Sequence, residues 1–170
     1  MYNKCITKEY NAVNTVFIDA YPRTKDDYPS LMPLPSPSSS FQQLCDYVKI
    51  GVTSFNRDFT RLYLMPVHTP DEFTPAQGRP MALNLLPLLQ GRRVVLLGRL
   101  VAEAFDIKSP GYEYFQWFDH PEWVQSSGIF SVIPHPLAPY YKHAETSVIE
   151  LQNFMGQVMA YDRIDEETNV

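Results

Sequence analysis

The stretch GRRVVLLGRLVAEAF, residues 91–105, decides the fold class of this chain. Its first half, 92–97, contains the short apolar run Val-Val-Leu-Leu at 94–97 after two arginines, which predicts a buried strand. Gly98 provides a turn, and apolar residues then recur at the spacing of one helix face, which predicts a helix over 99–106. A buried strand that turns into an amphipathic helix is typical of a parallel α/β sheet.

The same alternation extends over most of the chain. Strands are predicted at 14–19, 61–67, 92–97 and 128–133, and helices at 40–49, 80–90, 99–106 and 142–161. We therefore expect an α/β fold with three layers, αβα, in which helices cover both faces of a short, mostly parallel four-stranded sheet. Ligands of such sheets bind at the carboxyl ends of the strands.

The length of 170 residues fits a single domain, with its core over about 14–161. A stretch rich in proline and serine, 23–40, is predicted to be a long loop between the first strand and the first helix. The last residues, 162–170, are acidic, and we expect them to be a solvated, fraying end of the chain.

The composition excludes several classes of protein. Hydrophobic residues make up 45% of the chain and charged residues 19%, which rules out disorder for most of it. No apolar run approaches the ~20 residues that cross a bilayer, and the first residues lack a secretory signal, so we expect an intracellular, cytoplasmic protein with no membrane partner. The net charge of −5 counts against broad, charge-driven binding of nucleic acid, but it leaves room for a local basic strip.

Cys5 and Cys45 are the two cysteines of the chain. Two thiols cannot build a disulfide framework or a four-cysteine metal site, so we expect inert thiols, no bound metal and no cofactor. Cys45 falls on the apolar face of the helix predicted at 40–49, where a thiolate is disfavoured.

Four blocks of this sequence resemble the uracil-DNA glycosylase superfamily. The segment at 91–105 and the block FSVIPHPLAPYYKH at 130–143 are similar to the family's strand–helix turn and to its final strand, which ends in a His-Pro pair. VFIDAYPR at 16–23 lies where the family has its first active-site motif, and RLYLMPVHTP at 61–70 lies where it has a strand that ends in a pyrimidine-binding Asn. The resemblance covers roughly residues 14–160 and implies the family's fold, DNA as the partner, and a pocket for a flipped pyrimidine base.

The active-site motifs depart from those of the family. Ala20 and Tyr21 stand where the family has its water-handling side chain, so Asp19 is the nearby carboxylate. Met65 stands where the family has Asn, and His135 keeps the His-Pro pair although the following serine is lost. The resemblance therefore implies Asp19 and His135 as the catalytic pair. They would either cleave the bond between a modified base and its sugar or modify a flipped, thymine-type base without breaking that bond.

The other candidate residues would bind the substrate, and all of them lie at the ends of predicted strands. They are Tyr21, Pro22, Arg23, Met65, Arg99, Leu137, Tyr140, Tyr141 and Lys142. The cations Arg23, Arg99 and Lys142 would meet phosphates, and the apolar loop at 137–141 would fill the gap left by the flipped base or stack on bases.

A second interpretation stays open. The fold does not fix the function, and both the altered motifs and the negative net charge suit a non-catalytic binding module. Such a module would hold a nucleotide, or it would bind a protein partner through the aromatic run at 112–123. Two interpretations of that run stay open: a core or interface position, or the lining of a base-stacking pocket.

Overall fold

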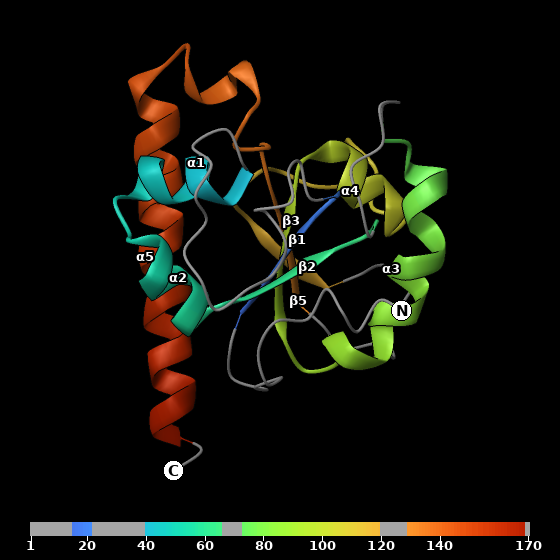
Figure 1. Cartoon of the computed structure of the whole chain (residues 1–170), viewed down its shortest axis with the longest axis horizontal. Helices are drawn as coiled ribbons and strands as arrows, with labels where there is room; N and C mark the ends of the chain where they lie inside the picture. Colours follow the sequence, from blue (N-terminus) through green and yellow to red (C-terminus); the bar gives the residue numbers. More distant parts are fainter. Residues whose placement is uncertain (1–14, 22–39, 66–72, 120–128, 169–170) are drawn as a thin grey trace.

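A five-stranded sheet forms the middle layer of the protein (Figure 1). We describe it from a computed structural model, which covers residues 15–21, 40–65, 73–119 and 129–168, with side chains described to residue 162. The strands are β1 (Val16–Asp19), β2 (Thr60–Tyr63), β3 (Arg93–Leu97), β4 (Trp117–Asp119) and β5 (Ile129–Ile133). Their order in the sheet is β2-β1-β3-β5-β4.

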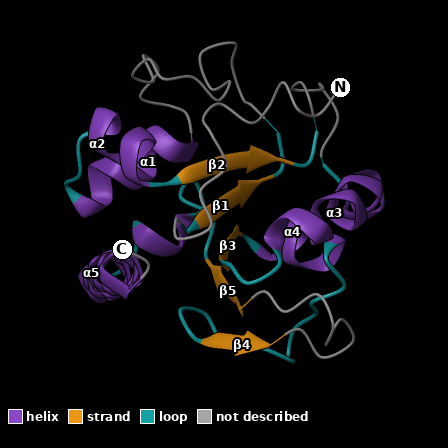
Figure 2. Cartoon of the chain, turned by 90° about the horizontal axis from the view of Figure 1, so that it is seen from below, coloured by secondary structure: helices purple, strands orange, loops and turns teal. Residues whose placement is uncertain are grey.

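The helices lie on both faces of this sheet (Figure 2). On one face are α1 (Ser40–Val48), α2 (Val52–Asp58) and α5 (Glu145–Thr168), and on the other are α3 (Pro75–Leu89) and α4 (Arg99–Ala104). A short 3₁₀ helix, η4 (Pro139–Tyr141), precedes α5. The expected α/β architecture, with helices on both faces of a sheet, is confirmed. None of the described helices is long and apolar enough to cross a membrane.

The core consists of two apolar clusters, one on each face of the sheet. Val16 and Ile18 of β1 belong to the cluster under α3 and α4, whereas Phe17 belongs to the cluster under α1, α2 and α5. Phe17 lies 5.1 Å from Phe55 and 5.2 Å from Phe59 between ring centroids. Because side chains of a strand alternate between its faces and both faces are covered, the central strands are apolar at nearly every position.

The sheet differs from the prediction in its strand number. The four predicted strands are present with shorter bounds and pair in parallel, but β4 adds a fifth, antiparallel strand beside β5. β4 has three residues, and its Trp117 and Phe118 came from a run predicted to be core or interface rather than strand. Three residues are too few to show a strand period in the sequence.

The helices also differ from the prediction, and the first differences concern α2 and α3. The helix α2 was not predicted, and α3 begins at Pro75 instead of residue 80. A capping box explains the earlier start, because the Thr74 hydroxyl accepts from the Gln77 amide while the Gln77 side chain accepts from the Thr74 amide. Pro80 therefore lies inside the helix rather than in its first turn.

The prediction of a solvated tail at 162–170 is wrong for its first residue, Asp162. The helix α5 continues to Thr168, and the Asp162 side chain is buried. Its carboxylate accepts from the Thr15 amide at 3.1 Å and the Thr15 hydroxyl at 2.7 Å, and it pairs with Arg93 at 2.5 Å. These contacts join the end of the chain to the starts of β1 and β3, a long-range pairing that a local charge pattern cannot reveal.

Candidate functional site

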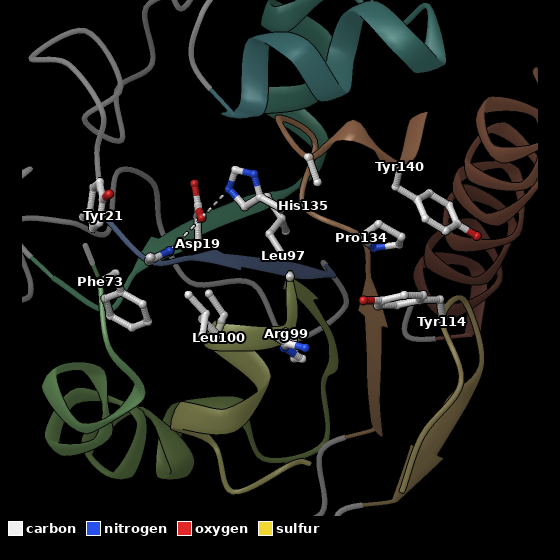
Figure 3. A pocket seen from close by; sticks show the side chains of 14 residues that line it. Asp19, Tyr21, Phe73, Leu97, Arg99, Leu100, Tyr114, Pro134, His135 and Tyr140 are labelled. Carbon is white, nitrogen blue, oxygen red and sulfur yellow. Dashed lines mark hydrogen bonds and ion pairs between the residues drawn. The ribbon is translucent and has the colours of Figure 1, made fainter. Parts of the chain in front are cut away.

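A cavity of about 430 Å³ opens at the carboxyl ends of β1, β3 and β5 (Figure 3). This is the edge of the sheet at which the sequence places its candidate residues. The end of β1 contributes Asp19, the turn from β3 into α4 contributes Gly98 and Arg99, and the segment after β5 contributes His135. Most of the remaining wall is apolar or aromatic, so the polar groups are few and concentrated.

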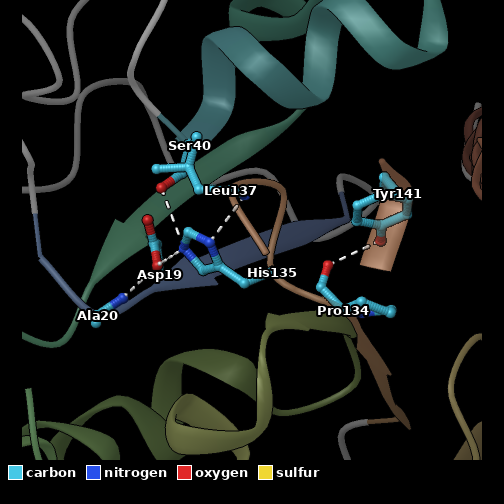
Figure 4. A network of polar contacts seen from close by, with 7 residues as sticks. All are labelled: Asp19, Ala20, Ser40, Pro134, His135, Leu137 and Tyr141. Atoms are coloured by element: carbon cyan, nitrogen blue, oxygen red, sulfur yellow. Dashed lines mark hydrogen bonds and ion pairs between the residues drawn. The ribbon is translucent and has the colours of Figure 1, made fainter. Parts of the chain in front are cut away.

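Asp19 and His135 meet on the wall of this cavity (Figure 4). The carboxylate oxygen Oδ1 of Asp19 lies 3.0 Å from Nε2 of His135 and accepts from the Ala20 amide at 2.7 Å. Asp19 is 1% exposed, and the His135 side chain is 17% exposed. Strand β3 lies between β1 and β5, so the pair forms across the top of β3 from residues that are 116 positions apart in the chain.

The hydrogen bonds of His135 determine where its proton lies. The Leu137 amide donates to Nδ1 at 3.1 Å, so Nδ1 offers its lone pair and the neutral ring carries its proton on Nε2. Nε2 in turn faces both Asp19 and, at 3.1 Å, the hydroxyl of Ser40. The geometry therefore corresponds to a neutral imidazole whose N–H points toward a carboxylate and a hydroxyl.

Ser40 is a contact that the sequence analysis did not predict. In the sequence, Ser40 has the residue type of an N-cap for the helix predicted at 40–49, yet in the structure its buried hydroxyl reaches His135. The three residues are not a serine-hydrolase triad, because in a triad the serine and the carboxylate bond to opposite ring nitrogens. Here both face Nε2, which carries the proton, so His135 cannot accept a proton from Ser40.

Gly98 shapes the turn that brings His135 to the cavity. Its φ of 95° lies where residues with side chains are strained, and its amide donates to the Ile133 carbonyl at 2.8 Å. A Cβ atom at this position would lie 3.2 Å from the Cβ of His135. The absence of a side chain therefore permits both the β3–α4 turn and the close approach of His135.

Two pairs of aromatic rings face each other across the cavity (Figure 3). Tyr21 and Phe73 lie 6.2 Å apart on one side, and Tyr114 and Tyr140 lie 5.8 Å apart on the other. Tyr114 comes from the aromatic run, for which the sequence left two interpretations open, a base-stacking pocket or a core or interface position. The next residue, Phe115, has a φ of 66° and packs against Phe154 in the core. This unusual backbone conformation lets two successive aromatic residues point in different directions, so that Tyr114 lines the cavity and Phe115 packs in the core.

Three of the predicted substrate-binding residues line the cavity, namely Tyr21, Arg99 and Tyr140. Leu137 contributes its backbone amide to His135, as described above. Lys142 is exposed at the end of η4. Pro22 and Arg23 lie outside the described residues.

Met65 lies near the end of β2 and Tyr141 lies in η4 after β5, but neither is among the described residues that line the cavity. Met65 is partly buried against the core cluster under α3 and α4. Tyr141 is a core residue, because η4 turns its ring inward and its hydroxyl donates to the Pro134 carbonyl at 2.8 Å. Burial also raises the pKa of Tyr141. A role of either side chain in substrate binding stays a prediction.

Two further observations concern reactive groups and metals. Cys45 is a free, buried cysteine, and burial raises the pKa of its thiol from 9.0 to about 12, in agreement with the expected inert thiol. Over the part of the chain that the structure describes, no group of three or more His, Cys, Asp or Glu side chains could hold a metal ion.

Comparison of the chain with protein-family models finds no match, and comparison with curated proteins finds none either.

Proposed function

We propose that the protein binds DNA and holds a flipped, modified pyrimidine base in the cavity at the ends of β1, β3 and β5. There, Asp19 and His135 would act on the base or on its bond to the sugar. The observation that carries this proposal is the hydrogen-bonded Asp19–His135 pair on the wall of an otherwise largely apolar and aromatic cavity.

The walls of the cavity suit a flat heterocycle. Enzymes that act on a flipped base stack it between aromatic or apolar side chains and bind its edge through hydrogen bonds. Tyr21 and Phe73 offer ring faces on one side, and Tyr114 and Tyr140 offer them on the other. The edge of a pyrimidine carries both donors and acceptors, which the Asp19 carboxylate and the His135 N–H complement.

The pair could support either reaction. In hydrolysis, the bond between C1′ and the base breaks, its electron pair leaves with the base, and a water oxygen bonds to C1′. Asp19 would accept a proton from that water, and the Nε2–H of His135 would donate to a base oxygen. In modification of the base, the same two groups would move protons on the ring while the sugar bond stays intact.

Contacts with the DNA backbone would come from the rim. Arg99 lines the cavity with 64% of its side chain exposed, and Lys142 is exposed at the end of η4. Side chains of this kind position a protein on phosphates without recognising sequence. Such a local contact is compatible with a net charge of −5, because it needs only a few cations at one edge.

A non-catalytic binding module is the second candidate, and one observation favours it. Both ring nitrogens of His135 and one oxygen of Asp19 already have hydrogen-bond partners within the protein. A pair satisfied in this way can shape a binding pocket without performing chemistry.

The test uses purified protein with duplex and single-stranded oligonucleotides that carry thymine, uracil, 5-hydroxymethyluracil or its phosphorylated form. Products are analysed by mass spectrometry, and binding is followed against salt. We expect loss of a base, or a mass change on it, that disappears in His135→Ala. His143→Ala is the matched control, because His143 is exposed and lies outside the cavity lining.

The outcomes separate the candidates. A mass change that needs His135 but not His143 supports the enzyme. Base-dependent binding without a mass change supports the module. Absence of both a mass change and DNA binding would refute the proposal, provided that thermal unfolding shows the protein to be folded.

A further inference from the structure

We infer that the base in the cavity comes from single-stranded DNA, and that a neighbouring unpaired base of the same strand stacks on the exposed ring of Tyr140. This inference rests on the proposed function, because it names the form of DNA that the same cavity would take. Three features support it: an exposed tyrosine on the cavity wall, a loop after β5 that is folded onto the protein, and a cavity wall that is poor in cations.

Tyr140 offers an aromatic ring to a ligand at one side of the cavity. It lies beside Tyr114 on the cavity wall, yet 37% of the residue is exposed (Figure 3). Its ring lies 5.8 Å from that of Tyr114 and 5.4 Å from that of Tyr141 between centroids, at interplanar angles of 65° and 81°. Both contacts are closer to perpendicular than to parallel, so neither neighbour is stacked flat on Tyr140. The ring of Tyr140 is therefore supported from the side and open to a flat partner.

The two neighbours of Tyr140 are themselves held in place. Tyr141 is 3% exposed, and its hydroxyl donates to the Pro134 carbonyl at 2.8 Å. Tyr114 precedes Phe115, which packs in the core against Phe154. A ring supported by fixed neighbours loses little conformational freedom when a base stacks on it, which favours binding.

The loop after β5 does not project as a wedge for duplex DNA would. Its backbone folds back on His135, because the Leu137 amide donates to Nδ1 at 3.1 Å and the Ala138 amide donates to the His135 carbonyl at 2.9 Å. Leu137 is half-buried and Tyr141 is buried, so Tyr140 is the exposed large apolar side chain of this loop. Proteins that open a duplex often insert apolar side chains between its base steps. A substrate that is already single-stranded needs no such insertion.

The charges near the cavity also favour a single strand. Arg99 is the one Lys or Arg among the described residues that line the cavity, and the net charge of the chain is −5. Duplex DNA carries one negative charge per ~1.7 Å of its axis, and proteins bind it largely by neutralising several phosphates. A single strand can instead be bound through its unpaired bases, because every base has a face that stacks on an aromatic ring.

The experiment measures Kd by fluorescence anisotropy for oligonucleotides that share one target base, 5-hydroxymethyluracil. The probes are a single strand, the same strand paired with its complement, and the single strand with an abasic site on each side of the target. We expect the duplex to bind at least about tenfold more weakly than the single strand, because the target must first be unpaired. Removing the neighbouring bases should weaken binding about fivefold or more.

Variants assign the stacking to Tyr140. In Tyr140→Ala, the intact single strand should bind no more tightly than the strand with abasic neighbours, whereas Tyr140→Phe should keep the difference. Tyr161→Ala is the matched control, since Tyr161 is 42% exposed on α5 and is not among the described residues that line the cavity. It should leave the difference unchanged.

Failure of this inference can be told apart from failure of the proposed function. A fourth probe, a single strand in which the target alone is abasic, measures what the cavity contributes. Weaker binding of this probe, together with equal affinity for single strand and duplex or no effect of the neighbouring bases, would refute the inference and leave the proposed function standing. Binding of this probe as tight as that of the intact strand would overturn both. The four probes decide the question on the unaltered protein even if Tyr140→Ala does not fold.

Discussion

Replacing Gly98 with alanine tests how the β3–α4 turn positions His135. The φ of 95° and ψ of 163° lie in a region that is essentially restricted to glycine, so the strain of an alanine there costs about 1–3 kcal/mol. The new Cβ would also lie 3.2 Å from the Cβ of His135, which forces a shift of a few tenths of an ångström. We therefore expect both a less stable protein and a displaced imidazole.

Alanine substitutions of two other glycines serve as controls, because they separate the backbone strain from the contact between the new Cβ and His135. Gly91 has a φ of 72°, and a Cβ there would meet nothing within 4 Å, so Gly91→Ala adds strain of about 1–2 kcal/mol without a contact. Gly156 lies within α5 with the same open space and no unusual φ, so Gly156→Ala should stabilise the helix by about 0.5–1 kcal/mol. For a protein of this size, 1 kcal/mol shifts Tm by about 2–4 °C.

The assay combines thermal unfolding with nitrogen-15 NMR of the histidine side chains. We expect Tm to fall by roughly 2–12 °C in Gly98→Ala and by roughly 2–8 °C in Gly91→Ala, and to rise slightly in Gly156→Ala. Gly98→Ala, but not Gly91→Ala, should shift the Nε2–H resonance of His135. If Gly98→Ala were as stable as the unaltered protein, or if His135 kept its resonance, the argument that this glycine positions His135 would be refuted.

Three further predictions concern buried polar groups. Asp162→Ala should lower the free energy of unfolding in urea by about 1–3 kcal/mol, because it removes the acceptor of the two Thr15 hydrogen bonds and the carboxylate that pairs with the partly buried Arg93. A loss below about 1 kcal/mol would show that the contacts of Asp162 with Thr15 and Arg93 do not stabilise the fold. Cys45 should resist thiol reagents at pH 8 until the protein unfolds. Because burial raises its pKa from 9.0 to about 12, its contribution to stability should be full below pH 9 and lost as the pH rises to 12, as measured against Cys45→Ala. Tyr141→Phe should cost about 1–3 kcal/mol in urea, because the Pro134 carbonyl loses its buried donor; an unchanged midpoint would contradict the packing of η4.

The arrangement of the sheet could be predicted largely from the sequence, because the parallel strands are buried on both faces. Runs such as 94–97 are apolar throughout and end at a glycine or a proline, so their existence and order are visible without tertiary information. Asp19 and His135 were expected at the carboxyl ends of two of these strands, and in the structure Asp19 Oδ1 lies 3.0 Å from His135 Nε2. β4 could not be predicted, because three residues hold their strand conformation only by pairing with β5.

The features that the sequence could not decide depend on contacts between distant residues or on the local backbone conformation. Ser40 looks like a helix cap in the sequence, and only the packing of α1 above the sheet brings its hydroxyl to His135. Tyr114 belongs to an aromatic run whose members look alike, and the positive φ of Phe115 decides which ring faces the cavity. Asp162 lies in an acidic stretch, yet its partners are at the opposite end of the chain.

The most direct test of the central claim is to locate the base on the protein by photocrosslinking. An oligonucleotide with a single 5-iodouracil is irradiated in complex with the protein, and the crosslinked residue is identified by mass spectrometry. The proposal predicts a crosslink to a ring of the cavity wall, one of Tyr21, Phe73, Tyr114 and Tyr140. Crosslinks confined to aromatic residues outside the cavity, such as the exposed Tyr161, or no crosslink at saturating protein, would contradict a flipped pyrimidine in this site.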